Sequence, residues 1–112
     1  MATTPKELIN AQITNSTGAI AYTAPTGTRT RITAAVICNT ESATPYTVDV
    51  YKVPSGDSPG AANKIINTRT LAGLESYTCP ELIGQILEAG DSIDAAASTT
   101  LKLNLIVSGV EM

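Results

Sequence analysis

The carboxylates best placed for chemistry lie in one short segment, where Asp91 and Asp94 follow Gly90 and Glu88 stands just upstream. Carboxylates this close could hold a calcium ion or act as an acid pair. Their spacing is not that of a calcium-binding DxDxDG loop. The chain also contains no His, which removes the commonest general base and most zinc and copper sites. We therefore interpret the segment as a solvated turn at the start of a strand, and we expect no catalytic residue, metal or cofactor.

Basic side chains offer a second kind of chemistry. Arg29, Arg31 and Arg69 could contact an anion or a protein partner, because arginine is favoured at interfaces. The alternative is an exposed strand face on which they pair with Asp49 or Glu75. The 7 Lys and Arg residues form no run and the net charge is −3, so nucleic-acid binding is not expected.

The two cysteines, Cys38 and Cys79, are too far apart for a CxxC pair and lie in apolar segments. We interpret them as buried thiols, and a disulfide between them remains the alternative. No stretch approaches the roughly 18 consecutive apolar residues of a transmembrane helix, so we expect no membrane span. The N-terminal segment MATTPKELIN lacks the apolar core of a signal peptide.

Short strands are the elements that must position these residues. Apolar and polar residues alternate with a period of two between turns that contain Gly, Pro, Asn and Ser. The pattern predicts a single all-β domain over residues 1–112, an antiparallel β-sandwich or jelly roll of about eight strands. We expect those strands at residues 7–14, 19–24, 28–39, 46–53, 64–71, 74–79, 91–97 and 101–110.

Two local pairings are expected from the turns. Residues 64–71 and 74–79 should form a hairpin around Ala72-Gly73, and the last two strands should pair around Ser98-Thr99-Thr100.

One segment, residues 80–89, has a helical pattern. Pro80 suits a first helical position, apolar residues then recur at helical spacing, and Gly90 stands just past the end. We therefore expect one short helix of about two turns. Residues 54–63 (PSGDSPGAAN) are expected to be an exposed loop, in which Asp57 is a turn former.

The core should be aliphatic, because the aromatic content is 4% and every aromatic residue is Tyr. Aliphatic side chains bury less area than aromatic rings, so we expect moderate stability that increases on association with other copies or a scaffold. The last strand should be central, with Leu101 on its buried face. The core residues that we expect are Ile32, Val36, Val48, Val50, Leu103 and Leu105, and Val107 shares the face of the last two.

Three strings of the sequence resemble a known family. They are YTAPTGTRTRITAAVICNT, then TVDVYKVPSG, then LESYTCPELIGQILEAGDSIDA, followed by an apolar strand. Together they run from about Tyr22 to Val110 and resemble the small capsid decoration proteins of tailed bacteriophages, also called cement or staple proteins. The resemblance implies a protein that is made in the bacterial cytoplasm and located on the outer surface of the virion. It would bind the major capsid protein where subunits meet, as a homodimer or homotrimer, and stabilise the assembled shell.

Two other functions remain open. One is a phage tail, head–tail adaptor or fibre-associated structural protein. The other is a ligand- or carbohydrate-binding β-sandwich, although sugar sites usually use an exposed aromatic platform. The expected partner contacts are a flexible N-terminal arm over residues 1–6, the loop at residues 54–63 and the three arginines. In full, the candidate partner-binding residues are Met1, Ala2, Thr3, Thr4, Pro5, Lys6, Arg29, Arg31, Asp57 and Arg69.

Overall fold

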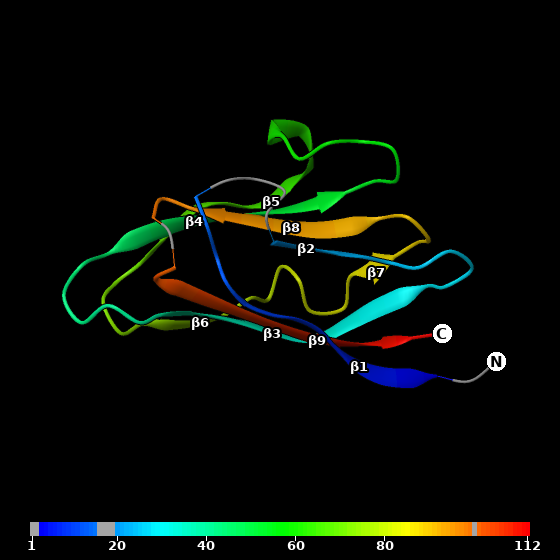
Figure 1. Cartoon of the computed structure of the whole chain (residues 1–112), viewed down its shortest axis with the longest axis horizontal. Helices are drawn as coiled ribbons and strands as arrows, with labels where there is room; N and C mark the ends of the chain where they lie inside the picture. The colour runs from blue at the N-terminus through cyan, green and yellow to red at the C-terminus, as the bar shows by residue number, and fades with distance from the viewer. Residues whose placement is uncertain (1–2, 16–19, 100) are drawn as a thin grey trace.

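Alternating apolar and polar residues produce nine strands in the part of the chain that the computed structural model describes, residues 3–15, 20–99 and 101–112. They form two antiparallel sheets packed face to face (Figure 1). Sheet A contains, in order, β1 (Thr4–Gln12), β9 (Leu103–Glu111), β3 (Thr30–Asn39) and β6 (Ser76–Thr78), and β7 (Ile86–Leu87) also pairs with β3. Sheet B contains β2 (Ile20–Thr23), β8 (Ser92–Ala97), β4 (Tyr46–Val53) and β5 (Lys64–Leu71). The all-β sandwich is confirmed.

The chain crosses from one sheet to the other at nearly every connection, and the strand order is that of a jelly roll. Only the β4–β5 and β6–β7 connections stay within one sheet. Both predicted hairpins are therefore wrong, because β5 and β6 lie in different sheets, as do β8 and β9. At the first of them, a turn closed by the bond from the Glu75 N–H to the Ala72 carbonyl leads the chain into the other sheet.

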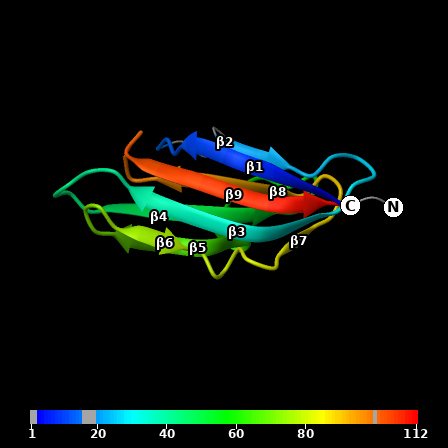
Figure 2. The ribbon, with the colours of Figure 1, turned by 90° about the horizontal axis from the view of Figure 1, so that it is seen from below.

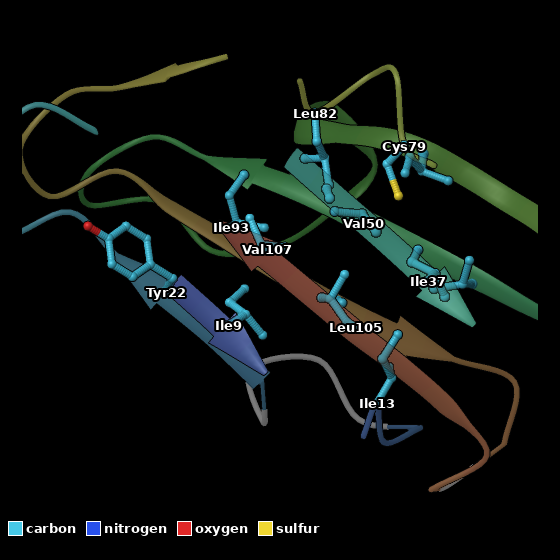
Figure 3. Packing of buried hydrophobic residues seen from close by; sticks show 14 of the residues in the cluster. Ile9, Ile13, Tyr22, Ile37, Val50, Cys79, Leu82, Ile93, Leu105 and Val107 are labelled. Carbon is cyan, nitrogen blue, oxygen red and sulfur yellow. The ribbon is translucent and has the colours of Figure 1, made fainter. Parts of the chain in front are cut away.

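The last strand is central, as predicted, since β9 lies between β1 and β3. Leu103 and Leu105 are fully buried, and Figure 3 shows Leu105 and Val107 pointing into the core. Leu101 does not belong to this face: it precedes β9, has a positive φ of 64° and is 50% exposed.

The prediction that Val36 faces the core is also wrong. A bulge in β3 between Ile32 and Ala34 inserts one extra residue opposite β9. The alternation therefore reverses after Ile32, so that Ala35 and Ile37 face the core and Val36 faces outward.

The predicted helix at residues 80–89 does not form. Residues 80–84 make tight turns, in which the Leu82 N–H donates to the Cys79 carbonyl at 3.0 Å. Gly84 then takes a positive φ of 90°, and its N–H donates to the Ile32 carbonyl, which attaches the chain to the edge of β3. Cys79 and Leu82 point into the core from this segment (Figure 3) and close one side of the sandwich. The helical spacing of apolar residues is thus used to fill the core from a turn. The one helical element in the described residues is a 3-10 turn, η1 (Ala61–Asn63).

The loop between β4 and β5 covers part of the outer face of sheet B. Tyr51 and Val53 are buried although they lie on the opposite side of β4 from the core residue Val50. The turn η1 contacts β4, and Figure 1 shows it above sheet B. The tip of this loop, residues 54–58, is exposed as predicted, whereas its later part is half-buried at residues 59, 60 and 63.

The two cysteines are free thiols in different environments. Cys79 is buried, as predicted, and this burial is the main cause that raises the pKa of its thiol to about 12. Cys38 is only half-buried, because the bulge in β3 turns it to the outer side of sheet A. None of the described helical segments is long and apolar enough to cross a membrane.

Candidate functional site

One end of the sandwich gathers both ends of the chain and three connections (Figure 1). The residues that begin or end the strands here are paired, since Ser92 lies opposite both Thr23 and Val53, and Thr30 lies opposite Glu111. The β2–β3, β4–β5 and β7–β8 connections therefore meet at this end, which we call the termini end. Loops that a rigid sheet holds together are a common location for binding sites.

The Asp91 carboxylate holds two of these connections together. Its Oδ1 accepts the N–H of Ser55 at 2.9 Å, and its Oδ2 accepts the N–H of Glu88 at 3.1 Å. The backbone of the same turn binds the β2–β3 connection, because the Ala24 N–H donates to the Asp91 carbonyl at 2.9 Å. The three connections are thus fixed relative to one another before any partner binds.

The same bonds explain what the acidic segment does. Asp91 already accepts two backbone N–H groups, which is the behaviour of a turn residue. Asp94 lies within β8, buried, and its Oδ1 accepts the N–H of Ala95 at 2.8 Å. Among the described residues, no three Cys, Asp or Glu side chains gather closely enough to hold a metal ion.

A surface hollow of about 580 Å³ lies at the termini end. Arg29 and Glu88 form an ion pair on its rim, with Nε and Oε2 2.8 Å apart and side chains that are 62% and 58% exposed. Two backbone bonds join Arg29 to Met112 and fix the last residue beside the pair. The hollow is lined by Thr3, Gly27, Thr28, Arg29, Glu88, Ala89 and Met112.

A hydrogen-bond network lies at this end, buried at Tyr22 and Thr30 and exposed at Lys6. The Tyr22 hydroxyl donates to Glu111 Oε2 and is 2.8 Å from the Thr30 hydroxyl, while Lys6 Nζ is 3.4 Å from Glu111 Oε2. Burial, and then the hydrogen bond to Glu111, raises the pKa of Tyr22 to about 12. The same hydrogen bond holds the pKa of the Glu111 carboxyl below its ordinary value. The network links β2 in one sheet to β9 in the other, and nothing in the sequence pattern indicated it.

The structure brings some of the predicted partner-binding residues together. Thr3 and Arg29 line the same hollow, and Asp57 is exposed in the β4–β5 loop at the same end. The Asp57 N–H donates to the Pro54 carbonyl at 3.0 Å, as expected of a turn residue.

The predicted flexible arm is wrong over residues 4–6. Thr4, Pro5 and Lys6 are exposed, but they belong to β1 and lie opposite Glu111, Val110 and Gly109 of β9. The first strand therefore begins at Thr4 and not at residue 7, and these three residues belong to sheet A. Met1 and Ala2 lie outside the described residues.

Arg69 has a different role from Arg29. Its guanidinium lies 3.7 Å from the centre of the Tyr77 ring, and the Tyr77 hydroxyl donates to Glu81 Oε1 at 2.5 Å. Burial, and then this hydrogen bond, raises the pKa of Tyr77 to about 12. Since Arg69 is on β5 and Tyr77 is on β6, the stack connects the two sheets.

The predicted pairing of the arginines with Asp49 or Glu75 is wrong. Asp49 accepts the N–H of Thr68 at 2.5 Å and lies 3.4 Å from Lys64 Nζ. Glu75 accepts the N–H of Ala72 at 2.7 Å. Both carboxylates thus bind groups other than the arginines. Within the described chain Arg31 forms no ion pair.

Sequence reasoning missed a second surface, the outer face of sheet A. It is made of side chains that alternate with core residues along each strand, and strand register places them in four rows. The clearest sequence signal was the outward position of Ile106 between the core residues Leu105 and Val107. The rows are Gln12, Asn104, Cys38 and Ser76; Asn10, Ile106, Val36 and Thr78; Glu7, Ser108 and Ala34; and Pro5, Val110, Arg31 and Ile86.

No protein-family model matches this chain, and no curated protein matches it.

Proposed function

We propose that this protein is a capsid decoration protein of a tailed bacteriophage, which binds the outer surface of an assembled capsid where its subunits meet. The observation that carries the proposal is the preformed surface at the termini end. There Asp91 fixes the connections around the exposed Arg29–Glu88 pair and its hollow. The resemblance of the sequence to decoration proteins supplies the kind of partner.

A preformed loop surface suits this role for an energetic reason. Ordering loops on binding costs free energy, and connections that are already tied together avoid most of that cost. A site made by several capsid subunits exists only after assembly, so binding there stabilises the assembled shell and not the free subunit. When many copies bind one shell, their contributions to its stability add up even where each copy makes only a small contact.

The jelly-roll order is also found in lectins, and the tyrosines bear on that alternative. All four lie in the described part of the chain, and none of them is exposed. Tyr22 and Tyr51 are buried, whereas Tyr46 and Tyr77 are half-buried and pack against the core. The chain therefore offers no aromatic platform on which a sugar ring could stack, and the shell-binding role is favoured.

The test is co-sedimentation with shells assembled from the major capsid protein of the same genome. We expect saturable binding to assembled shells, no binding to free capsid subunits, and a higher rupture temperature for decorated shells. Arg29→Glu should weaken shell binding at least about tenfold, since it replaces one side of the exposed ion pair with a like charge beside Glu88.

A matched control exists at the opposite end of the sandwich. Lys102 Nζ lies 2.8 Å from Glu41 Oε1 in a similar surface ion pair, so Lys102→Glu should leave shell binding unchanged. Equal effects of the two variants would contradict docking through the termini end. Absence of the protein from shells, together with binding to purified tails, would replace the decoration role with the tail role.

A further inference from the structure

We propose that the outer face of sheet A joins two copies of this chain in a symmetric, face-to-face dimer. This inference does not depend on shell binding. It names the partner of the one large sheet face that the described part of the chain leaves uncovered. Figure 2 shows β1, β9 and β3 side by side in this sheet.

The two outer faces of the sandwich differ in what covers them. On sheet B the β4–β5 loop lies over the face, and Tyr51 and Val53 are buried beneath it. On sheet A no described segment plays this part, and Ile106 and Ile86 are 40% and 36% exposed. Val36, Cys38 and Val110 are half-buried around them. Exposed apolar side chains that lie together on one face are typical of an interaction site.

Charge on this face is sparse and of both signs. Only two side chains in its four rows are charged at neutral pH, Glu7 at the β1 edge and Arg31 on β3. Most of the other members are small, apolar or uncharged, such as Ala34, Ser108 and Asn10. Interface centres are depleted of charge in the same way.

The strand register shows how a second copy would fit. A two-fold axis parallel to β9 places β9 against β9, so that Ile106 meets its own copy, and it places β1 against β3. Each row then faces its own copy, so Glu7 lies opposite Ala34 of the second copy, and Arg31 lies in the next row. Neighbouring rows are two residues apart, about 7 Å, which long side chains can span. Each Glu7 is therefore within reach of the second copy's Arg31, and symmetry forms the pair twice.

The size of the contact sets its strength. Three overlapping strands at about 4.8 Å spacing, with about 24 Å of length, give a flat footprint of about 340 Å² per copy. The two footprints together cover about 680 Å², less than the roughly 1,200 Å² of a stable interface, so we expect a weak, transient dimer with a dissociation constant in the upper micromolar range. Copies concentrated on a common surface would dimerise more completely.

The test is sedimentation velocity of the full chain from about 5 to 500 µM, a range that brackets such a constant. We expect a concentration-dependent change from monomer to dimer. Ile106→Lys should abolish it, whereas Ile83→Lys should not, because Ile83 is similarly exposed, at 46%, but lies in the turn outside the four rows. A circular dichroism melt of each variant checks that it is folded.

Charge exchange tests the arrangement itself. Glu7→Arg and Arg31→Glu should each weaken the dimer several-fold, and the double variant should restore it. A chain that stays monomeric at every concentration would overturn the proposal. So would a dimer that Ile83→Lys disrupts and Ile106→Lys does not. Shell binding is measured in a separate assay, so a failure of the dimer proposal can be told apart from a failure of the shell-binding proposal.

Discussion

Asn39 is the residue on which one end of the sandwich depends, and changing it to Asp gives a sharp test. Its side chain is fully buried, and its Nδ2 lies 2.9, 3.1 and 3.2 Å from the carbonyl oxygens of Thr44, Leu71 and Ala72. Its Oδ1 accepts the N–H of Glu41 at 3.0 Å. Three acceptors around one nitrogen fix the orientation of the amide. Asn39 thus ties the β3–β4 loop to the turn after β5.

Asn39→Asp keeps the shape of the side chain but replaces the Nδ2 donor with an oxygen that accepts hydrogen bonds. The bond from Glu41 remains, but at neutral pH an oxygen with negative charge faces the three carbonyl oxygens. The Ala72 carbonyl keeps its bond from the Glu75 N–H, so the loss concerns mainly Thr44 and Leu71. An uncompensated buried charge costs about 3–5 kcal/mol. Because the free energy of unfolding of a small domain is about 5–15 kcal/mol, this cost is a large part of the total stability.

The effect should depend on pH with a definite sign. Burial against carbonyl oxygens raises the pKa of the new carboxyl above its unfolded value of about 3.9. The folded variant then binds more protons than the unfolded chain between the two pKa values, so its stability falls as pH rises through that window. Below about pH 4 the protonated carboxyl can donate one of the lost hydrogen bonds, and part of the stability returns.

Urea unfolding of the wild type and Asn39→Asp at pH 7 and pH 4 measures this difference directly. Subtracting the wild type removes the titration of the other carboxylates. Asn39→Leu, which cannot ionise, should be destabilised by about 2–4 kcal/mol at both pH values. Asn104→Asp, on the half-exposed outer face of sheet A, should change stability by less than about 0.5 kcal/mol. A loss below about 1 kcal/mol for Asn39→Asp at pH 7, or the same loss at both pH values, would refute this account.

Four further predictions concern packing, titration and metals. Gly109→Ala should cost about 1–3 kcal/mol, because a Cβ there would lie 2.4 Å from a backbone oxygen of β3; Gly60→Ala, with open space around it, should be near neutral in the same urea assay. Leu103→Ala should cost about 2–5 kcal/mol because Leu103 is fully buried, and a cost like that of the exposed Leu101→Ala would mean that the face of β9 is reversed. Because the pKa of Tyr22 is raised from 10.0 to about 12, its contribution to stability is present below pH 10 and lost as pH rises toward 12; absorbance titration should show two late tyrosine ionisations, those of Tyr22 and Tyr77, of which Tyr22→Phe removes one. Thermal melts should coincide with and without excess chelator, since the carboxylate in the turn before β8 already accepts two backbone N–H groups; a large fall in melting temperature would indicate a structural metal.

Local alternation was enough to predict most strands. The ranges 46–53 and 64–71 are those of β4 and β5. Residues 46–53 alternate in sequence, whereas residues 64–71 are marked by the turn residues on either side, because irregular pairing interrupts the alternation of β5. The buried face of β9 also followed from alternation, since Leu103, Leu105 and Val107 are two residues apart. A period of two reports which side chains share a face, and that information is local.

What the sequence did not reveal is non-local. One extra residue in β3 reverses the alternation after Ile32 and moves Val36 outward, and no residue type at that position announces the bulge. The helical spacing at residues 80–89 is real, but pairing with the edge of β3 through Gly84 outweighs a short helix with little packing of its own. The hairpins failed because neighbouring strands of a jelly roll usually lie in different sheets.

The candidate site could not be assembled from the sequence for the same reason. Arg29 and Glu88 are far apart in the chain, as are Ser55 and Asp91, and each pair meets only because the β2–β3, β4–β5 and β7–β8 connections all return to the termini end. Sequence reasoning found Arg29 and Thr3 as single exposed residues, without their partners.

The topology also explains why only one outer face is left for a partner. A connection that stays within one sheet can fold back over the face of that sheet, and the β4–β5 loop does so on sheet B. The corresponding connection of sheet A, between β6 and β7, instead turns inward and places Cys79 and Leu82 in the core. Filling the core from that segment leaves no described segment to cover Ile106 and its neighbours. The same choice that closes the side of the sandwich therefore exposes the face through which two copies are proposed to meet.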